Sequence, residues 1–218
     1  MSLFADRADA GKRLARHLAE YSGNPDAVVV ALPRGGVPVA AEVARSLGLP
    51  LDIFLVRKLG VPGHEELAMG AIASGGGVIL NREIVDACGI AEGQIRVTAQ
   101  REEYEMARRE TLYRGSAPRI PLTGRDVLLV DDGLATGATM RAAVRAIRLE
   151  RPASIVAAVP VGAVDSCQAL RSAVDHLFCP QQPEPFGAVG AFYDRFGQTT
   201  DADVIECLHK ARNRGART

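Results

Sequence analysis

The sequence lacks an excess of charge of either sign. Lysine and arginine together count 26, aspartate and glutamate also count 26, and the formal net charge at pH 7 is +0. A chain without net positive charge has no overall field to draw it onto nucleic acid or an anionic membrane. We therefore expect neither of these as a partner, and any anion must be bound by a local site.

Cysteine is scarce, and its positions form no pattern typical of a metal site. No CxxC pair is present among the 4 cysteines. Their scattered spacing argues against structural zinc and provides no disulfide framework. We interpret all of them as reduced thiols: Cys88, Cys167, Cys179 and Cys207.

Long apolar runs are also missing. No segment is long enough to span a bilayer, because such a span needs about 20 apolar residues. Asp6, Arg7 and Lys12 stand where a secretory signal would need its apolar stretch. On this basis we expect a cytoplasmic protein.

The sequence does contain enough apolar side chains for one core. Hydrophobic residues make up 47% of the 218 residues and charged residues 24%, as in an ordinary soluble domain. A chain of this length can bury one substantial core. We therefore predict a single domain over residues 1–218.

Short apolar runs alternate with helical patterns along much of the chain. The first pattern, with Leu14 and Leu18, is an amphipathic helix that ends at residues 23–25. Parallel strands need crossover connections, so the alternation that follows predicts a parallel sheet covered by helices on both faces. We predict strands at residues 27–32, 51–56, 127–130, 155–160 and 174–178, and helices at residues 37–47, 139–149 and 165–172.

The region between the second and third of these strands has a different composition. Residues 60–66 are polar and loop-like, and residues 67–72 and 78–80 flank glycines in a pattern typical of a hairpin. Residues 81–125 carry charges of mixed sign and few large apolar side chains, which favours a solvated helix. We predict a mainly helical insertion there that serves as a lid or a subunit contact.

The residues that carry chemistry follow the strand at residues 127–130. Asp131 and Asp132 stand at its carboxyl end, where open parallel sheets bind ligands. Small residues then lead into a helix, so that backbone N–H groups and the positive helix terminus converge on one phosphate. Glycine allows close approach of the backbone, and threonine hydroxyls add donors. The predicted loop consists of Ala135, Thr136, Gly137, Ala138 and Thr139.

Two other kinds of protein also place acidic residues after an apolar strand. A receiver domain places its acidic pair near its own start and has a phosphoacceptor aspartate on a later strand, and no such site follows here. A Walker B strand requires a Gly-Lys-Ser/Thr loop, and Gly11-Lys12-Arg13 is not one. These alternatives, and a purely structural turn, are less favoured than a phosphate site.

Residues 127–139 resemble the signature of type I phosphoribosyltransferases, which is an apolar strand, two acidic residues and a Thr-Gly-x-Thr loop. Adenine-type enzymes share the pair found here at Leu134 and Ala135. The resemblance implies an α/β fold in which helices flank a parallel sheet. It also implies that Asp131 and Asp132 hold the ribose 2- and 3-hydroxyls of 5-phosphoribosyl-1-pyrophosphate, and Mg²⁺ through water and substrate. The loop of small residues would then cradle the 5-phosphate.

The loop after the first predicted strand matches the place where this family binds pyrophosphate. It contains Arg34, Gly35 and Gly36. Glycine tolerates unusual dihedral angles, and arginine forks onto phosphate oxygens. We predict a strained or cis peptide bond at Arg34-Gly35 or at its neighbour.

Arg57 and Lys58 stand at the predicted end of the second strand. By resemblance to adenine-type enzymes, they face the pyrophosphate below a loop that closes over the substrate. A solvated basic pair at a strand end is the alternative.

The C-terminal segment at residues 180–197 resembles the hood of hypoxanthine-guanine-type enzymes. Phe186 stands where an aromatic side chain of those enzymes stacks on the purine. A phenylalanine that only packs this segment is the alternative. Phe186 has no other evident apolar partner in the sequence, so we predict that it contacts the base.

Together these matches imply transfer of the phosphoribosyl group to a purine-like nucleobase with release of pyrophosphate, by a homodimer. Some family members carry an aspartate at the position of Ala135 that reaches the base, so the base and any general base stay open. Glu65 and Glu66 are candidates for that base by location alone. Overall the chain is similar to bacterial proteins known only as predicted phosphoribosyltransferases. The alternative from another class is a non-catalytic sensor of phosphoribosyl pyrophosphate or a nucleotide, although no helix-turn-helix is present to read nucleic acid.

Overall fold

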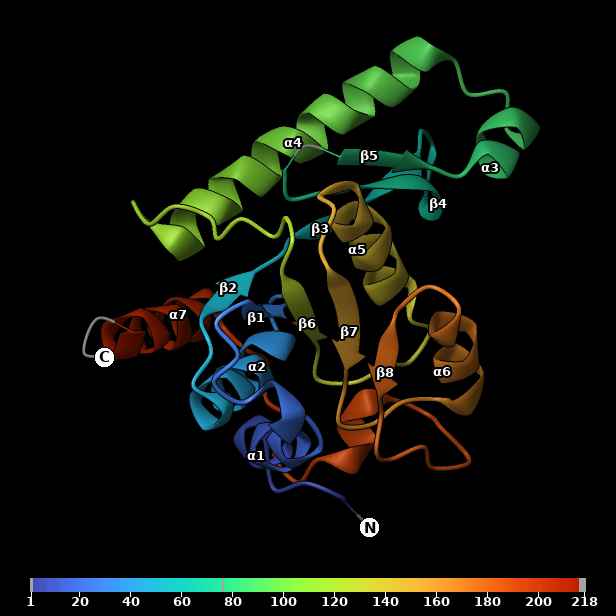
Figure 1. Ribbon diagram of the computed structural model, residues 1–218. Coiled ribbons are helices and arrows are strands. Elements are labelled where there is room, and N and C mark those ends of the chain that lie inside the picture. The colour runs from blue at the N-terminus through green and yellow to red at the C-terminus, as the bar shows by residue number, and fades with distance from the viewer. Residues whose placement is uncertain (1, 76, 216–218) are drawn as a thin grey trace.

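The computed structural model describes residues 2–75 and 77–215, and a parallel sheet forms the centre of this part of the chain (Figure 1). The strand order is β2-β1-β6-β7-β8. The side chains of β1 are all buried, as the continuous apolar run predicts, because helices cover both faces of the sheet. The strands are β1 (Ala27–Ala31), β2 (Leu51–Ile53), β6 (Asp126–Val130), β7 (Ser154–Ala158) and β8 (His176–Phe178).

The order of the strands reverses direction between β1 and β6. From β1 the chain adds β2 on one side, with Val29 opposite Leu51, and it later returns to place β6 on the other side, with Val29 opposite Leu128. The strands β7 and β8 then extend the sheet beyond β6. Open parallel sheets bind ligands at the carboxyl ends of their strands where the order reverses. The topology therefore favours a ligand site at the loops after β1 and β6.

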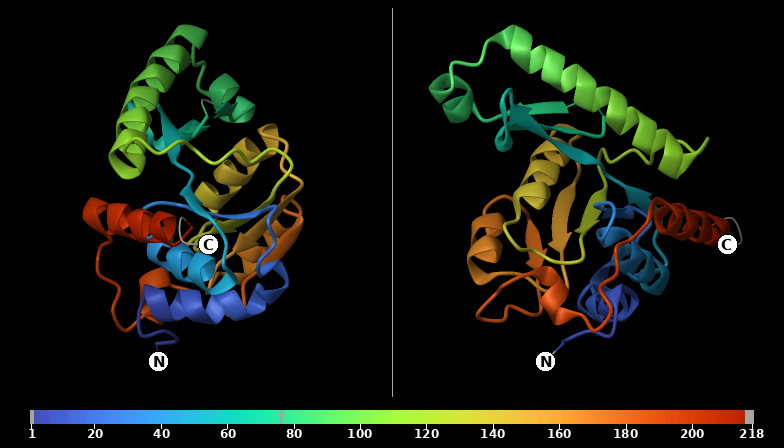
Figure 2. Two further views of the ribbon diagram at one scale, coloured as in Figure 1. Left: turned by 60° about the vertical axis from the view of Figure 1, so that its left-hand side comes forward. Right: turned by 180° about the vertical axis from the view of Figure 1, so that it is seen from behind.

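Alternate side chains of the central strands point into two apolar layers. Val29 and Leu128 pack with α1, α2 and α7, whereas Val28 and Leu129 pack with α5 and α6. Figure 2 shows α7 between α4 and the α1–α2 pair, and the contacts of α7 with α2 and α4 agree with this view. The predicted two-sided cover is confirmed. Its helices are α1 (Arg7–His17), α2 (Gly36–Leu47), α5 (Ala138–Leu149), α6 (Val164–Arg171) and α7 (Asp201–Gly215), with short 3-10 turns η1 (Ala19–Tyr21) and η2 (Val189–Phe192).

A second sheet lies beyond α5 and is antiparallel, with the order β3-β4-β5 (Figure 1). The long helix α4 crosses it and buries Ala99, Met106 and Tyr113, which repeat at heptad spacing. The predicted hairpin and the predicted helical character of this stretch are both confirmed. We call these elements the outer region: β3 (Val56–Val61), β4 (His64–Ala73), β5 (Gly77–Leu80), α3 (Arg82–Ala87) and α4 (Glu92–Arg114).

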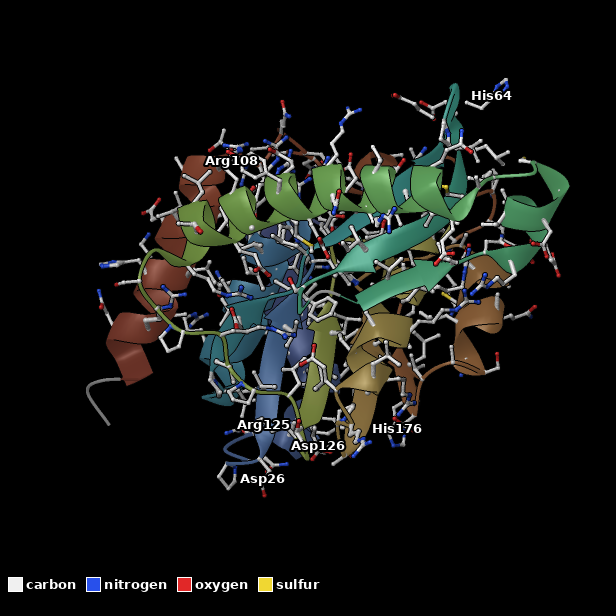
Figure 3. The ribbon with its side chains drawn as sticks, turned by 90° about the horizontal axis from the view of Figure 1, so that it is seen from above. Asp26, His64, Arg108, Arg125, Asp126 and His176 are labelled. Atoms are coloured by element: carbon white, nitrogen blue, oxygen red, sulfur yellow. The ribbon has the colours of Figure 1, made fainter. Side chains whose placement is uncertain are left out.

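The predicted strand at residues 51–56 is wrong in one respect, because the chain changes sheets within it. Ile53 ends β2, and Val56 begins β3 opposite Ala73 of β4. Arg57 and Lys58 therefore lie inside a strand and not at a strand end, since β4 pairs with this stretch. The loop expected at residues 60–66 is wrong for most of its length, because residues 60–61 belong to β3 and residues 64–66 to β4, and only residues 62–63 form the turn of the β3–β4 hairpin. In Figure 3 its His64 lies on the side away from Asp26, Asp126 and His176, which mark the amino ends of central strands.

The helix α7 was not predicted from the sequence, although its start carries a recognisable signal. The Thr200 N–H donates to Asp203 Oδ2 at 2.8 Å, and the Asp203 N–H donates to Thr200 Oγ1 at 3.2 Å. This reciprocal cap occupies backbone donors that the first turn leaves unpaired. Val204 and Leu208, four residues apart, are buried in the core. Of the helices described, none combines the length and apolar composition of a membrane span.

Candidate functional site

Asp131 and Asp132 follow β6 directly, at the point where the strand order reverses, and we call this pair the acidic turn. The Asp132 N–H donates to Asp131 Oδ1 at 2.8 Å. Burial raises the pKa of Asp131 well above its ordinary value, and the neighbouring Asp132 carboxylate raises it further. Burial also raises the pKa of Asp132, whereas the hydrogen bond from Arg7 lowers it. The turn thus concentrates two partly desolvated carboxylates, which favours a ligand that supplies hydroxyl groups or a cation.

The loop at residues 33–36 lies against the acidic turn. A Cβ atom on Gly35 would lie 2.1 Å from Asp132 Oδ2, and one on Gly36 would lie 2.9 Å from Asp131 Oδ1. Both positions therefore require glycine, because any side chain would displace the carboxylates. The peptide bond between Pro33 and Arg34 is cis, which confirms the predicted geometry at the neighbour of Arg34-Gly35. The structure brings these two predicted segments together.

The loop at residues 135–139 begins helix α5 and presents an open helix terminus. Gly137 has φ +69°, which favours glycine, and it supplies no capping side chain, although the Ala138 N–H makes a long hydrogen bond of 3.4 Å to Thr136 Oγ1. The side chains around it are small and exposed, so that backbone N–H groups and the helix dipole can meet an anion. The structure thus agrees with the geometry expected of Ala135, Thr136, Ala138 and Thr139.

Arg141 adds a positive charge to this loop that the sequence reasoning did not identify. Its Nη1 donates to the Thr136 carbonyl at 2.8 Å and lies 2.9 Å from where a Gly137 Cβ would be. The guanidinium therefore lies over the loop. Its position in the first turn of α5, two residues after Thr139, was the available signal.

Arg34 points from the 33–36 loop toward the start of α7. Its Nη1 lies 3.5 Å from Asp201 Oδ1, and the Tyr113 hydroxyl donates to the same oxygen at 2.6 Å. The hydrogen bond from Tyr113 lowers the pKa of Asp201, and Arg34 lowers it further. Asp201 thereby joins Arg34 to both α4 and α7.

Arg57 and Lys58 are engaged by glutamates of the outer region. Arg57 Nε lies 2.5 Å from Glu102 Oε2 on α4. Lys58 Nζ donates to the Glu66 carbonyl at 3.1 Å and lies 3.5 Å from its carboxylate. Arg57 is partly buried and Lys58 is exposed, because neighbouring residues of a strand face opposite sides. Their contact with a ligand stays a prediction.

Phe186 packs against another ring of the C-terminal segment. Its centroid lies 5.1 Å from that of Phe192, and both rings adjoin a small buried cluster that contains Phe4 and Tyr193. The expectation that Phe186 has no apolar partner is therefore wrong, because η2 places Phe192 beside it. Phe186 is half-buried, and its contact with a base stays a prediction.

Two residues that the sequence reasoning missed hold Asp132 in place. Arg7 Nε donates to Asp132 Oδ2 at 2.8 Å, and the Tyr193 hydroxyl donates to the Asp132 carbonyl at 2.6 Å. Burial raises the pKa of Tyr193, and the Asp132 carboxylate raises it further, so the hydroxyl keeps its proton. Arg7 lies 125 positions from Asp132, so no local pattern indicated the pair.

The side chains of the acidic turn are oxygen donors of the kind that a divalent cation takes. Among the described residues, no group of three or more His, Cys, Asp and Glu side chains is placed to hold a metal ion alone. Two adjacent carboxylates fit Mg²⁺, which prefers oxygen ligands and completes its shell with water and substrate. A cavity of about 680 Å³ lies elsewhere, between α2, α7 and residues 117–120, and neither Asp131 nor Asp132 lines it.

Comparisons with known proteins show the family of the chain. Residues 3–193 match the family model described as phosphoribosyl transferase domain. A Mycobacterium tuberculosis protein provisionally named a phosphoribosyl transferase is 44% identical over 211 residues, which are 97% of this chain and 47% of that protein. The chain thus spans about half the length of this curated relative.

Two further proteins are similar over different lengths. The bifunctional protein PyrR of Chloroflexus aurantiacus is 38% identical over 136 residues, which are 58% of this chain and 65% of that protein. A Thermus thermophilus protein of known crystal structure is 42% identical in sequence to this chain. The two structures superpose with a TM-score of 0.84, and the match covers 96% of this chain and 99% of that one.

Proposed function

The chain belongs to the phosphoribosyl transferase domain family, and we propose that it transfers the phosphoribosyl group of 5-phosphoribosyl-1-pyrophosphate to a nucleobase with release of pyrophosphate. The observation that carries this proposal is the meeting of the acidic turn with the 33–36 loop at the reversal of strand order. The open terminus of α5 supplies an anion site after the same strand. The Thermus structure of the same architecture supports the type I fold.

Each segment then has a role set by its chemistry. Asp131 and Asp132 accept hydrogen bonds from the ribose hydroxyls through their carboxyl oxygens. The 135–139 loop and Arg141 hold the 5-phosphate. Gly35 and Gly36 allow the backbone to approach the pyrophosphate, and Arg34 turns from Asp201 to pair with it.

The reaction breaks the bond between ribose C1 and a pyrophosphate oxygen and forms a bond from C1 to a ring nitrogen of the base, which gives up its proton to a general base or to water. Positive charge develops on the sugar as these bonds exchange, and the carboxylates beneath the ribose stabilise it. Holding both reactants in line provides much of the acceleration. When bound, Mg²⁺ would neutralise charge on pyrophosphate and ribose oxygens, held by Asp131 and Asp132 through water and substrate.

We propose a purine-like base as the acceptor. Phe186 offers it a flat apolar contact from the hood. Ala135 supplies no carboxylate for a ring nitrogen, so any general base must come from another segment. Glu65 and Glu66, near the tip of the β3–β4 hairpin, are exposed and lie on the segment expected to close.

Two measurements test the proposal in sequence. Calorimetry with Mg²⁺ and phosphoribosyl pyrophosphate should show binding, and a panel of purine and pyrimidine bases should show pyrophosphate release with at least one purine. Binding with a uniformly silent panel would overturn the transferase proposal in favour of a non-catalytic sensor. Absence of binding by folded protein would overturn both.

Two expectations about the whole protein belong with this proposal. We infer a cytoplasmic location, which fractionation of the source cells would test. We also infer a homodimer, which sedimentation would test.

A further inference from the structure

Arg7 lies at the start of α1, outside every sequence motif described above, yet its side chain is only 12% exposed. Three groups hold its guanidinium. Its Nε donates to Asp132 Oδ2 at 2.8 Å, its Nη1 donates to the Gly197 carbonyl at 2.7 Å, and it lies 3.8 Å from the centroid of the Phe196 ring. An arginine fixed by a carboxylate, a carbonyl and an aromatic face has one determined position.

The hood segment that holds Arg7 is itself tied to the acidic turn. Tyr193, whose ring centroid lies 4.9 Å from that of Phe196, donates its hydroxyl to the Asp132 carbonyl. A Cβ atom on Gly133 would lie 2.5 Å from a Val189 methyl carbon, so η2 rests directly on the residue after the pair. The hood therefore contacts the backbone carbonyl of Asp132 directly, through Tyr193. It contacts the carboxylate of Asp132 indirectly, through Arg7.

We propose that Arg7 is a positioning residue of the transfer site, which orients the Asp132 carboxylate for the ribose and couples it to the hood. This inference rests on the proposed function, since it assumes that Asp132 binds the sugar. If Arg7 has this role, then Asp132, which contacts the ribose, and the hood, which contacts the base, keep a fixed position relative to each other. Arg7 would thereby help to set the distance between the two reacting groups.

A purely structural role for Arg7 predicts a different result from a positioning role. A structural arginine contributes to the stability of α1, and its loss lowers the melting temperature without changing the affinity of the folded protein. A positioning arginine changes affinity in protein that remains folded. Residues that orient a binding carboxylate without touching the ligand change affinity by about 10-fold to 100-fold in metal sites, and a similar scale applies here.

Arg13 offers a matched control on the same helix. Like Arg7 it pairs with an aspartate, Asp9, at 2.9 Å and lies near an aromatic ring, with its guanidinium 5.6 Å from the Phe4 centroid. Its pair is exposed and does not involve the acidic turn. Arg13→Ala therefore removes the same kind of side chain and the same kinds of contact at a position without a role in the site.

The experiment is calorimetry of phosphoribosyl pyrophosphate with Mg²⁺ on the full chain and three variants, with melting temperatures recorded in parallel. We expect Arg7→Ala to weaken affinity about 10-fold or more, Arg7→Lys to recover part of it, and Arg13→Ala to stay within about twofold of the original chain. Lysine keeps the charge but cannot form the same two-point contact.

The outcomes separate this inference from the proposed function. If the original chain does not bind phosphoribosyl pyrophosphate, the function itself fails. If it binds and folded Arg7→Ala binds equally well, the function stands and the positioning role is overturned. Should Arg7→Ala fail to fold, Arg7→Lys decides: weaker affinity supports the role, and unchanged affinity overturns it.

Discussion

The central sheet and the outer region share one apolar cluster, but the outer region adds a buried polar network where α4 meets β2. The strands of the central sheet are covered by apolar side chains on both faces, and many of these are fully buried. The outer region also buries apolar residues such as Leu59 and Met69, but its junction with the central sheet contains buried charges. Apolar packing is non-directional, whereas a buried ion pair depends on one geometry.

The polar part of this junction is centred on Arg114, at the end of α4. Its Nε lies 2.9 Å from Asp52 Oδ1, and its Nη2 donates to the Ile53 carbonyl at 2.6 Å. The second Asp52 oxygen accepts from the Ile120 N–H at 2.9 Å. Glu110, one turn earlier in α4, accepts from the Ser74 hydroxyl at 2.5 Å. The difference teaches that apolar packing joins the outer region to the core, while hydrogen bonds to the strand next to β1 add a contact that depends on one geometry.

The largest effect should come from the acidic turn on the central sheet. We expect Asp131→Asn with Asp132→Asn to abolish binding of phosphoribosyl pyrophosphate, a loss of at least about 100-fold, because two carboxylate acceptors are removed at once. Calorimetry measures this loss. The fold should persist, because neutral amides relieve the cost of burying two carboxylates.

Circular dichroism provides the control for this double variant. A native spectrum with lost binding supports the assigned role. A native spectrum with unchanged affinity would remove the acidic turn from the ribose contact.

Much of the central region was predictable because its strands are short, apolar and separated by helices. The β1 and β6 strands lie where continuous apolar runs predict them. The break between β2 and β3 was not predictable in this way, because residues 51–56 are apolar except for Asp52 and contain no glycine or proline. Phe54 still donates its N–H to Ala31, so the run starts as one strand before it changes sheets.

The candidate site shows the same division between local and distant information. The 33–36 loop meets the acidic turn through Gly35 and Gly36, and both segments directly follow strands that were predicted from the sequence. The contact of Arg7 with Asp132 joins residues 125 positions apart, and the contact of Phe186 with Phe192 depends on the turn at η2. Such contacts exist only after the chain has folded.

Arg114→Ala tests the polar junction. We expect it to lower the free energy of unfolding by about 3–5 kcal/mol, because it leaves the buried Asp52 carboxylate without its cation. The two side chains are 6% and 5% exposed. Urea denaturation measures the change.

Arg148→Ala is the matched control, because its pair with Asp175 has the same distance of 2.9 Å but both side chains are 39% exposed. It should cost at most about 1 kcal/mol. Equal losses for the two variants would contradict the distinction between a buried junction and a surface pair.

Phe186→Ala tests the hood of the central region. We expect it to weaken base affinity by about threefold to tenfold, since an aromatic contact contributes about 0.5–1.5 kcal/mol. Phe192→Ala removes the same ring pair without removing the ring assigned to the base. Equal effects of the two variants would show that Phe186 only packs the hood.

The smallest effect concerns the two basic residues of β3. A double-mutant cycle should give a coupling of about 1 kcal/mol between Arg57 and Glu102, whose contact is partly buried, and almost none between Lys58 and the exposed Glu66. If Arg57 turns to the pyrophosphate, then the first coupling should fall when the cycle is repeated with saturating phosphoribosyl pyrophosphate. Ligand competes for the guanidinium in that state. A coupling that is the same with and without ligand would make Arg57 a structural residue of the outer region and exclude it from the site.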